Sequence, residues 1–145
     1  MKLSTRAKYG IHAMLHLAMY QGMGPQPIKI IAEVQNVPEQ YLEQLIAVLR
    51  REGLVTSVRG AQGGYNLAKP PEEITMAELV RALEGPISLS DCLSDEEYCE
   101  KACVCPTKRL WERLSQSIDD VLSGVTLADM QADHMRLQAE REDVS

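Results

Sequence analysis

The four cysteines of the chain lie within fourteen residues of one another, in the pattern Cys92-x6-Cys99-x3-Cys103-x-Cys105. The surrounding segment 88–104 is polar and acidic and has no periodic apolar pattern, so it is predicted to be a loop. Such a loop offers no core in which thiols would serve as small buried apolar groups. The cysteines therefore indicate metal binding or redox chemistry.

The setting of these thiols disfavours disulfides. The N-terminus has no apolar run typical of a signal peptide, and no segment is long and apolar enough to span a bilayer. We therefore expect a cytoplasmic protein without membrane contact. Because the cytosol keeps thiols reduced, structural disulfides are not expected.

The spacing narrows the choice of metal. Structural zinc sites usually pair cysteines about two to four residues apart, and the gap of six between Cys92 and Cys99 departs from that rule. Thiolates also suit iron–sulphur clusters. Cys105 directly precedes Pro106 at a predicted helix start, where the helix dipole stabilises a thiolate. An enzyme such as a thiol oxidoreductase is not expected, because the chain has no Cys-x-x-Cys motif and no accompanying polar catalytic set.

Apolar periodicity and capping signals predict the elements that position these residues. The predicted helices are 4–21, 28–35, one beginning at Pro38 and ending at Gly53, one from a Thr75/Glu78 capping box to Glu84, 106–123, and one capped by Thr126 and Asp129 that frays near Arg141. Segments 54–59 and 65–67 flank a glycine turn and predict a hairpin. In helix 106–123 an apolar seam suits packing against another helix: Trp111, Leu114, Ile118, Val121 and Val125. The predicted fold is mainly α with a small β-hairpin, a winged helix-turn-helix plus a long C-terminal dimerisation helix.

The net charge of −6 conceals an asymmetry between the two halves of the chain. Residues 1–69 hold eight Lys and Arg against four Glu, a net charge of +4. Residues 70–145 hold seven Lys and Arg against seventeen Asp and Glu, a net charge of −10. The first half is therefore the one suited to meet phosphates.

The second helix of a helix-turn-helix enters the major groove of DNA, and residues near its start touch base edges. Near the start of the predicted helix that begins at Pro38, the residues are Glu39, Gln40, Tyr41, Glu43 and Gln44. Gln can pair with adenine, and Glu can accept from the cytosine amino group. The alternative is that they are only the solvated face of an amphipathic helix.

The predicted hairpin offers a second DNA contact. Arg59 lies beside three glycines, a setting that suits insertion of an Arg into a minor groove. Four residues near the N-terminus could hold phosphates alongside: Lys2, Arg6, Lys8 and Tyr9. The alternatives are an ordinary turn and a solvated Arg. A nucleotide-binding P-loop fits this turn less well, because its Gly-Lys-Ser/Thr ending is absent.

Several short motifs along the chain together match the pattern of one protein family. They are Tyr41-Leu42-Glu43-Gln44-Leu45, Leu49-Arg50 with Gly53-Leu54-Val55, Ser57-Val58-Arg59-Gly60 with Gly63-Gly64-Tyr65, Leu83-Glu84-Gly85-Pro86-Ile87, and Thr126-Leu127. From Met1 to about Met130 the chain thereby resembles the IscR-type, BadM-like winged-helix transcription regulators. The resemblance implies a homodimer whose long C-terminal helices pair across a two-fold axis. It also implies base contacts from Glu43 and Gln44 and a wing contact from Arg59.

The resemblance further implies an iron–sulphur cluster held by Cys92, Cys99 and Cys105, with [2Fe-2S] favoured over [4Fe-4S]; Cys103 is then an extra thiol. Where known members carry a histidine as fourth ligand, this chain has Lys108, which is charged and a poor ligand. Three replacements stay open. They are Cys103, a small thiol or water, and a histidine of the first helix, His12 or His16, each of which could instead simply pack on the helix surface or at an interface.

The expected organisation is a DNA-binding domain (1–87), a cluster-binding loop (88–105), and a dimerisation helix with a helical tail (106–145). The expected function is a DNA-binding transcription regulator, a repressor that senses iron–sulphur, iron or redox status. The alternative is a cluster-free repressor of cysteine or sulphur metabolism controlled by a partner enzyme. The expected partners are a double-stranded DNA operator, a second copy of the chain, and cluster-assembly or cysteine-metabolism proteins.

Overall fold

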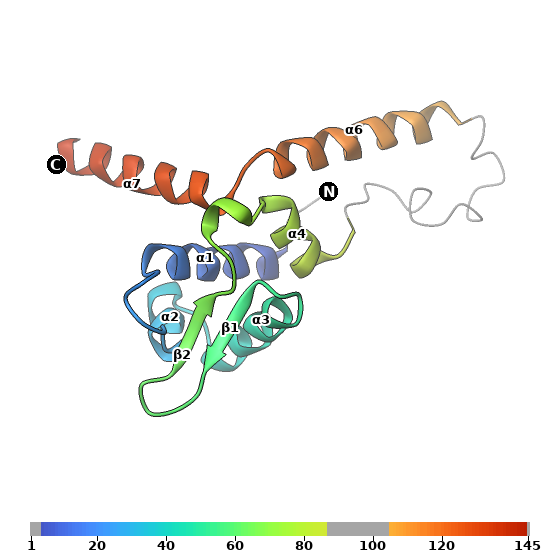
Figure 1. The fold of residues 1–145 in the computed structure, drawn as a ribbon. Coiled ribbons are helices and arrows are strands. Elements are labelled where there is room, and N and C mark those ends of the chain that lie inside the picture. The colour runs from blue at the N-terminus through green and yellow to red at the C-terminus, as the bar shows by residue number, and fades with distance from the viewer. Residues whose placement is uncertain (1–3, 87–104, 145) are drawn as a thin grey trace.

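A computed structural model describes residues 4–86 and 105–144 of the chain (Figure 1). Its elements follow in the order α1 (Thr5–Met19), α2 (Ile28–Gln35), α3 (Glu39–Arg51), β1 (Val55–Val58), β2 (Gly64–Leu67), η1 (Pro71–Glu73), α4 (Met76–Glu84), α6 (Pro106–Ser123) and α7 (Leu127–Val144). The mainly helical fold with one antiparallel hairpin confirms the predicted fold class. The predicted loop 88–104 lies outside the described residues.

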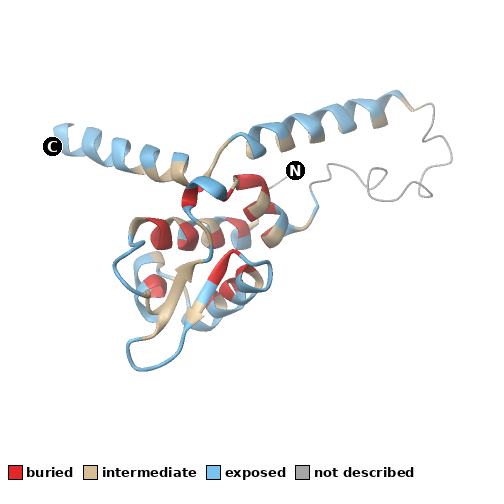
Figure 2. Ribbon diagram, in the orientation of Figure 1, coloured by how far each residue is buried: buried red, intermediate tan, exposed pale blue. Residues whose placement is uncertain are grey.

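One apolar core joins the first four helices, the base of the hairpin and the start of α7 (Figure 2). Helix α3 shows how the sequence builds it, because Leu42, Leu45 and Leu49 recur at helical spacing and each is at most 1% exposed. The outer side of the same helix is polar and exposed. Burial of this one stripe therefore fixes which side chains α3 presents to solvent.

Side-chain caps begin three of the helices. Ser4 accepts from the Ala7 amide at 3.4 Å, and Thr75 accepts from the Glu78 amide at 3.2 Å. At α7, the Asp129 amide donates to Thr126 Oγ1 at 3.1 Å while the Thr126 amide donates to Asp129 Oδ2 at 2.9 Å. Such caps satisfy amides that have no partner within the helix. The caps predicted at Thr75 and at Thr126 are confirmed. Of the predicted Thr75/Glu78 capping box only the Thr75 half is present, since the Glu78 carboxylate pairs with Lys69 at 2.9 Å.

Two local predictions were wrong, and one short element was not predicted. Pro38 is the N-cap of α3 and Glu39 its first helical residue, because Pro38 has an extended backbone with a ψ of 135°. The short 3-10 helix Pro71–Glu73 was not predicted. Helix α7 does not fray near Arg141 but continues to Val144, and Arg136 supports its last turns by pairing with Asp133 at 3.6 Å and with Glu140 at 3.1 Å.

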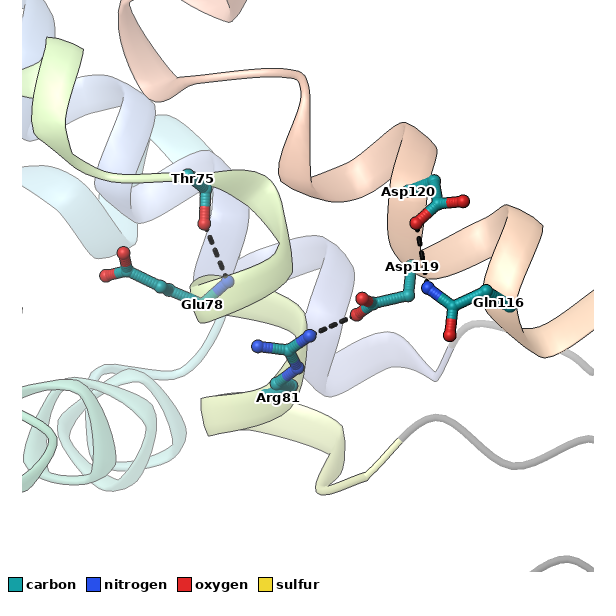
Figure 3. A network of polar contacts seen from close by, with 6 residues as sticks. All are labelled: Thr75, Glu78, Arg81, Gln116, Asp119 and Asp120. Carbon is teal, nitrogen blue, oxygen red and sulfur yellow. Dashed lines mark hydrogen bonds and ion pairs between the residues drawn. The ribbon is translucent and has the colours of Figure 1, made fainter.

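The C-terminal helices are attached to the winged domain at their junction. The Met76 amide donates to the Val125 carbonyl and the Leu127 amide donates to the Ile74 carbonyl, both at 2.8 Å. Further along, Arg81 of α4 forms an ion pair with Asp119 of α6 (Figure 3). Helix α6 is thereby held against α4, and none of its residues is buried.

The hairpin of β1 and β2, residues 55–67, is the wing, and it is hydrogen-bonded to the segment that precedes α2. Strands β1 and β2 pair antiparallel, with Val55 opposite Leu67 and Val58 opposite Gly64. On the other edge of β2, Tyr65 and Gln26 exchange two backbone hydrogen bonds of 2.9 Å each. A Cβ placed on Gly64 would lie 2.4 Å from the carbonyl carbon and oxygen of Gln26. Glycine is therefore required where the wing meets this segment.

Replacing Gly64 with Ala is expected to lower the free energy of unfolding by about 1–3 kcal/mol, because a methyl group cannot enter a packed backbone contact without displacing it. Urea denaturation followed by circular dichroism measures the change. The matched control is Gly60→Ala, whose added Cβ meets no atom within 4 Å and only strains a backbone with a φ of +116°. A loss for Gly64→Ala no larger than the loss for Gly60→Ala would contradict the packing argument.

Candidate nucleic-acid interface

The outer face of α3 carries the predicted base-reading residues. Gln40, Glu43 and Gln44 are all exposed, within the first two turns of the helix. Tyr41 is half-buried, and its ring packs edge-on against Tyr9 of α1 with centroids 6.2 Å apart. That contact places the first half of α1 beside the start of α3. The exposed amides and carboxylate have the donor and acceptor chemistry that base edges present in a major groove.

The wing projects from the end of the molecule opposite α6 and α7 (Figure 1). Arg59 follows β1 directly and is exposed, and Gly60 after it has a φ of +116°, a conformation that glycine adopts at low cost. Arg59 and the outer side of the wing line an open groove with the start of α2 and two residues of α3. The fold thus brings the wing beside α3, the helix in the position of a recognition helix, as a winged helix-turn-helix requires.

The basic residues predicted near the N-terminus do not join this groove. Arg6 and Lys8 are exposed on α1, but neither lines the groove that Arg59 occupies. The ring of Tyr9 is partly covered by its contact with Tyr41. Lys2 lies outside the described residues. A phosphate contact by Arg6 or Lys8 therefore stays a prediction.

Only one of the four cysteines lies within the described residues. Cys105 is the N-cap of α6, and its Sγ lies 2.9 Å from Thr107 Oγ1. Hydrogen bonds from the Thr107 side chain and from the Lys108 amide stabilise the thiolate and lower the pKa of Cys105. Cys92, Cys99 and Cys103 lie outside the described residues, so their grouping with Cys105 stays a prediction. Within residues 4–86 and 105–144, no group of three His, Cys, Asp or Glu gathers as a metal site.

The histidines and the lysine considered at the fourth ligand position have different surroundings. His16 is only 7% exposed, its Nε2 lies 3.3 Å from Gln26 Oε1, and its ring packs against Tyr20. Burial lowers the pKa of His16, because a charged ring would lose its hydration there. His12 is exposed. The ammonium group of Lys108 forms an ion pair with Glu112, with 3.7 Å between Nζ and Oε1. His16 thus has a structural role of its own, and this favours packing over ligation for this residue.

The Rrf2 family, described as "Iron-dependent Transcriptional regulator", matches residues 3–133 of the chain. The chain belongs to this family. It is 46% identical over 131 residues to the HTH-type transcriptional regulator CymR of Bacillus subtilis, covering 90% of this chain and 89% of that one. The family assignment confirms the resemblance seen in the sequence motifs.

Solved structures of Rrf2 relatives have the same fold. The structure titled "The Structure of CymR (YrzC) the Global Cysteine Regulator of B. subtilis" matches with a TM-score of 0.77 and 42% identity, covering 91% of this chain and 97% of that one. The structure titled "T. potens IscR" matches with a TM-score of 0.78 and 46% identity, covering 95% and 91%. This Rrf2 protein is therefore a DNA-binding transcriptional regulator with a winged helix, and not an enzyme.

Two features of this Rrf2 chain were missed by sequence reasoning. Lys29 and Arg50 line the groove that contains Arg59, although they are 21 residues apart in the chain. Leu110 is 48% exposed on α6 but lies outside the predicted apolar seam. Lys29 and Arg50 could not be inferred from periodicity, because their shared groove depends on how α2 and α3 pack beside the wing. Leu110 lies four residues before Leu114, so the helical period could have added it to the seam. In the described parts of the chain, no helix is both long and apolar enough to cross a membrane.

Proposed function

We propose that this Rrf2 protein binds operator DNA as a homodimer, and that an iron–sulphur cluster held by Cys92, Cys99 and Cys105 sets its affinity for the operator. The observation that carries DNA reading is the exposed polar face of α3, with Gln40, Glu43 and Gln44, beside a wing that carries Arg59. Helix α3 would read base edges in the major groove while Arg59 enters the adjacent minor groove.

The exposed apolar side chains of α6 support the homodimer. Leu110, Leu114 and Val121 are 48%, 41% and 65% exposed, and their spacings of four and seven place them on one face of the helix. Ile118 is half-buried beside them. A stripe of this kind is typical of a helix that packs against another helix. Pairing of two α6 helices about a two-fold axis would set two recognition helices for half-sites about one helical turn apart or a multiple of it.

The donor chemistry of the cysteine segment supports the cluster. Cys105 presents its thiol at the start of α6, beside Thr107 and with no carboxylate contact in the described residues. Soft thiolates are the ligands that iron–sulphur clusters require. A bound cluster would supply a redox- and iron-dependent charge at the end of the dimerisation helix. We propose 1–87, 88–105 and 106–145 as the DNA-binding, cluster-binding and dimerisation parts.

A second function is favoured by the likeness to CymR, one solved form of which is titled a global cysteine regulator. In that case the protein would bind DNA without a cluster, and a partner enzyme of cysteine metabolism would control it. The absorption spectrum of protein purified without oxygen separates the two functions. An iron–sulphur cluster absorbs visible light and colours the protein, whereas a cluster-free protein absorbs only in the ultraviolet.

Replacing Arg59 with Ala is expected to weaken operator binding by about 1–3 kcal/mol, roughly 5- to 150-fold, because the wing would lose its groove contact. The operator is obtained by selecting random duplexes with the wild-type protein, and affinities are measured by fluorescence anisotropy at fixed salt. Ala61→Ser, also exposed in the wing, controls for changes in the turn. Wild-type affinity in Arg59→Ala would remove the wing from the interface.

A further inference from the structure

One open groove of about 510 Å³ separates the start of α2, the recognition helix and the wing. Three cations line it from three different elements: Lys29 in the first turn of α2, Arg50 in the last turn of α3, and Arg59 in the wing. Glu39, in the first turn of α3, is the one carboxylate among its lining residues. The groove therefore carries an excess of positive charge.

The charges of this groove are not neutralised within the protein. Lys29, Arg50 and Arg59 are all exposed, and none forms an ion pair with any residue that the structure describes. Glu39 likewise has no ion pair in these segments. Unpaired like charges that converge on one groove repel one another in the free protein. A bound anion would relieve that repulsion.

The start of α2 adds to the positive potential. Its N-cap is Pro27, which makes no side-chain hydrogen bond to the helix, and both Pro27 and Ile28 line the groove beside Lys29. The Ile30 and Ile31 amides donate to the Pro27 carbonyl, at 3.1 and 3.3 Å, so the Ile28 and Lys29 amides are the ones without a partner within the helix. The helix dipole places positive charge at this end. The cations of the groove and the start of α2 therefore both favour an anionic ligand.

The extent of the groove points to a polyanion rather than to a single small anion. Glu39 and Arg50 are at opposite ends of α3, about 16 Å apart at a helical rise of about 1.5 Å per residue. One DNA strand carries a charge about every 3.4 Å along the duplex axis. Several phosphates of one strand can therefore lie along the groove, whereas one phosphate ion would occupy only part of it.

We infer that this groove holds the sugar-phosphate strand between the major groove read by α3 and the minor groove entered by the wing, with Lys29 and Arg50 contacting its phosphates. The inference rests on the proposed DNA binding and adds to it two residues that position the duplex without reading its sequence. Glu39 then faces phosphates and weakens binding by repulsion. Its carboxylate opposes the cations that share the groove.

The test compares salt dependence among four variants. Affinities of Lys29→Gln, Arg50→Gln, Glu39→Gln and Arg51→Gln are measured by anisotropy from about 50 to about 200 mM salt, for the selected operator and for an unrelated duplex. Arg51→Gln is the matched control, because Arg51 adjoins Arg50 and is exposed but does not line the groove.

Lys29→Gln and Arg50→Gln should each weaken binding of both duplexes alike by roughly 3- to 10-fold. Each should also make the fall of log affinity with log salt less steep, by about 1 in the slope. Glu39→Gln should strengthen binding of both duplexes, and Arg51→Gln should leave the slope at its wild-type value. Unchanged slopes for Lys29→Gln and Arg50→Gln, in a protein whose wild type binds DNA, would overturn this inference alone. Wild-type protein that binds neither duplex would overturn the proposed function and this inference with it.

Discussion

Replacing Val121 with Asp should convert a dimeric protein into a folded monomer. Val121 is 65% exposed in the protomer, so a carboxylate there costs the protomer little. In a dimer paired through α6, the same carboxylate would lose its hydration at the seam, at a cost of several kcal/mol for each copy. Because each 1.4 kcal/mol is about tenfold in affinity, dissociation should be promoted roughly a thousandfold or more.

Sedimentation equilibrium at micromolar concentration measures the change in mass, and circular dichroism verifies that the variant is folded. Val121 is a sharper choice than Ile118, since Ile118 is half-buried in the protomer and a charge there also strains the fold. Gln116→Glu is the matched control: it adds a negative charge on the other side of α6, where Gln116 donates to Asp120 at 2.8 Å (Figure 3). A Val121→Asp protein that sediments as a dimer would exclude this face of α6 from the interface.

Single cysteine replacements should divide into two groups after anaerobic reconstitution. Cys92→Ser, Cys99→Ser and Cys105→Ser should each be colourless, because a hard hydroxyl oxygen replaces a soft thiolate at the cluster. Cys103→Ser should stay brown, since Cys103 is not among the three proposed ligands. Visible absorption, with iron and sulphide analysis, measures cluster content. Stoichiometric zinc in wild-type protein that never acquires iron and sulphide would contradict the cluster.

Lys108→His extends this test to the fourth ligand position. Lys108 lies in the first turn of α6, three residues after Cys105, and its Nζ lies 3.7 Å from Glu112 Oε1. A neutral imidazole at that position is a metal ligand, whereas the ammonium group is not. The cluster of Lys108→His should therefore survive exposure to air longer than the wild-type cluster. Lys108→Gln removes the same charge without adding a ligand, and equal lifetimes in the two variants would contradict ligation by the imidazole.

The local elements of the fold could be predicted because their signals lie in neighbouring residues. The bounds 28–35 of α2 follow from its apolar spacing and flanking breakers, and the cap of α4 follows from Thr75 and Glu78. The pairing of Gln26 with Tyr65 and that of Thr75 with Thr126 could not be predicted. Each joins isolated residues with no periodic pattern, and tertiary packing alone brings them together.

The candidate site was predictable only in part, for the same reason. Polar residues on the outer face of α3 can be identified from the helical period, and Arg59 from its glycine turn. Lys29 enters the site because α2 starts beside the wing, a contact that no spacing in the sequence encodes. Leu110 could have been found from its spacing of four from Leu114, whereas the exposure of this face of α6 follows from α4, which holds the other side of the helix through Arg81 and Asp119.

The most direct test of the account is the operator affinity of one protein preparation with and without its cluster. The selected operator is titrated by anisotropy with anaerobically reconstituted protein, and then with the same preparation after chelation of the iron. Coupling between a sensing site and a binding site is typically about 1–3 kcal/mol, so the two affinities should differ by about 5- to 150-fold. Equal affinities, in a preparation whose spectrum shows that the cluster was bound and then lost, would contradict control of DNA binding by a cluster.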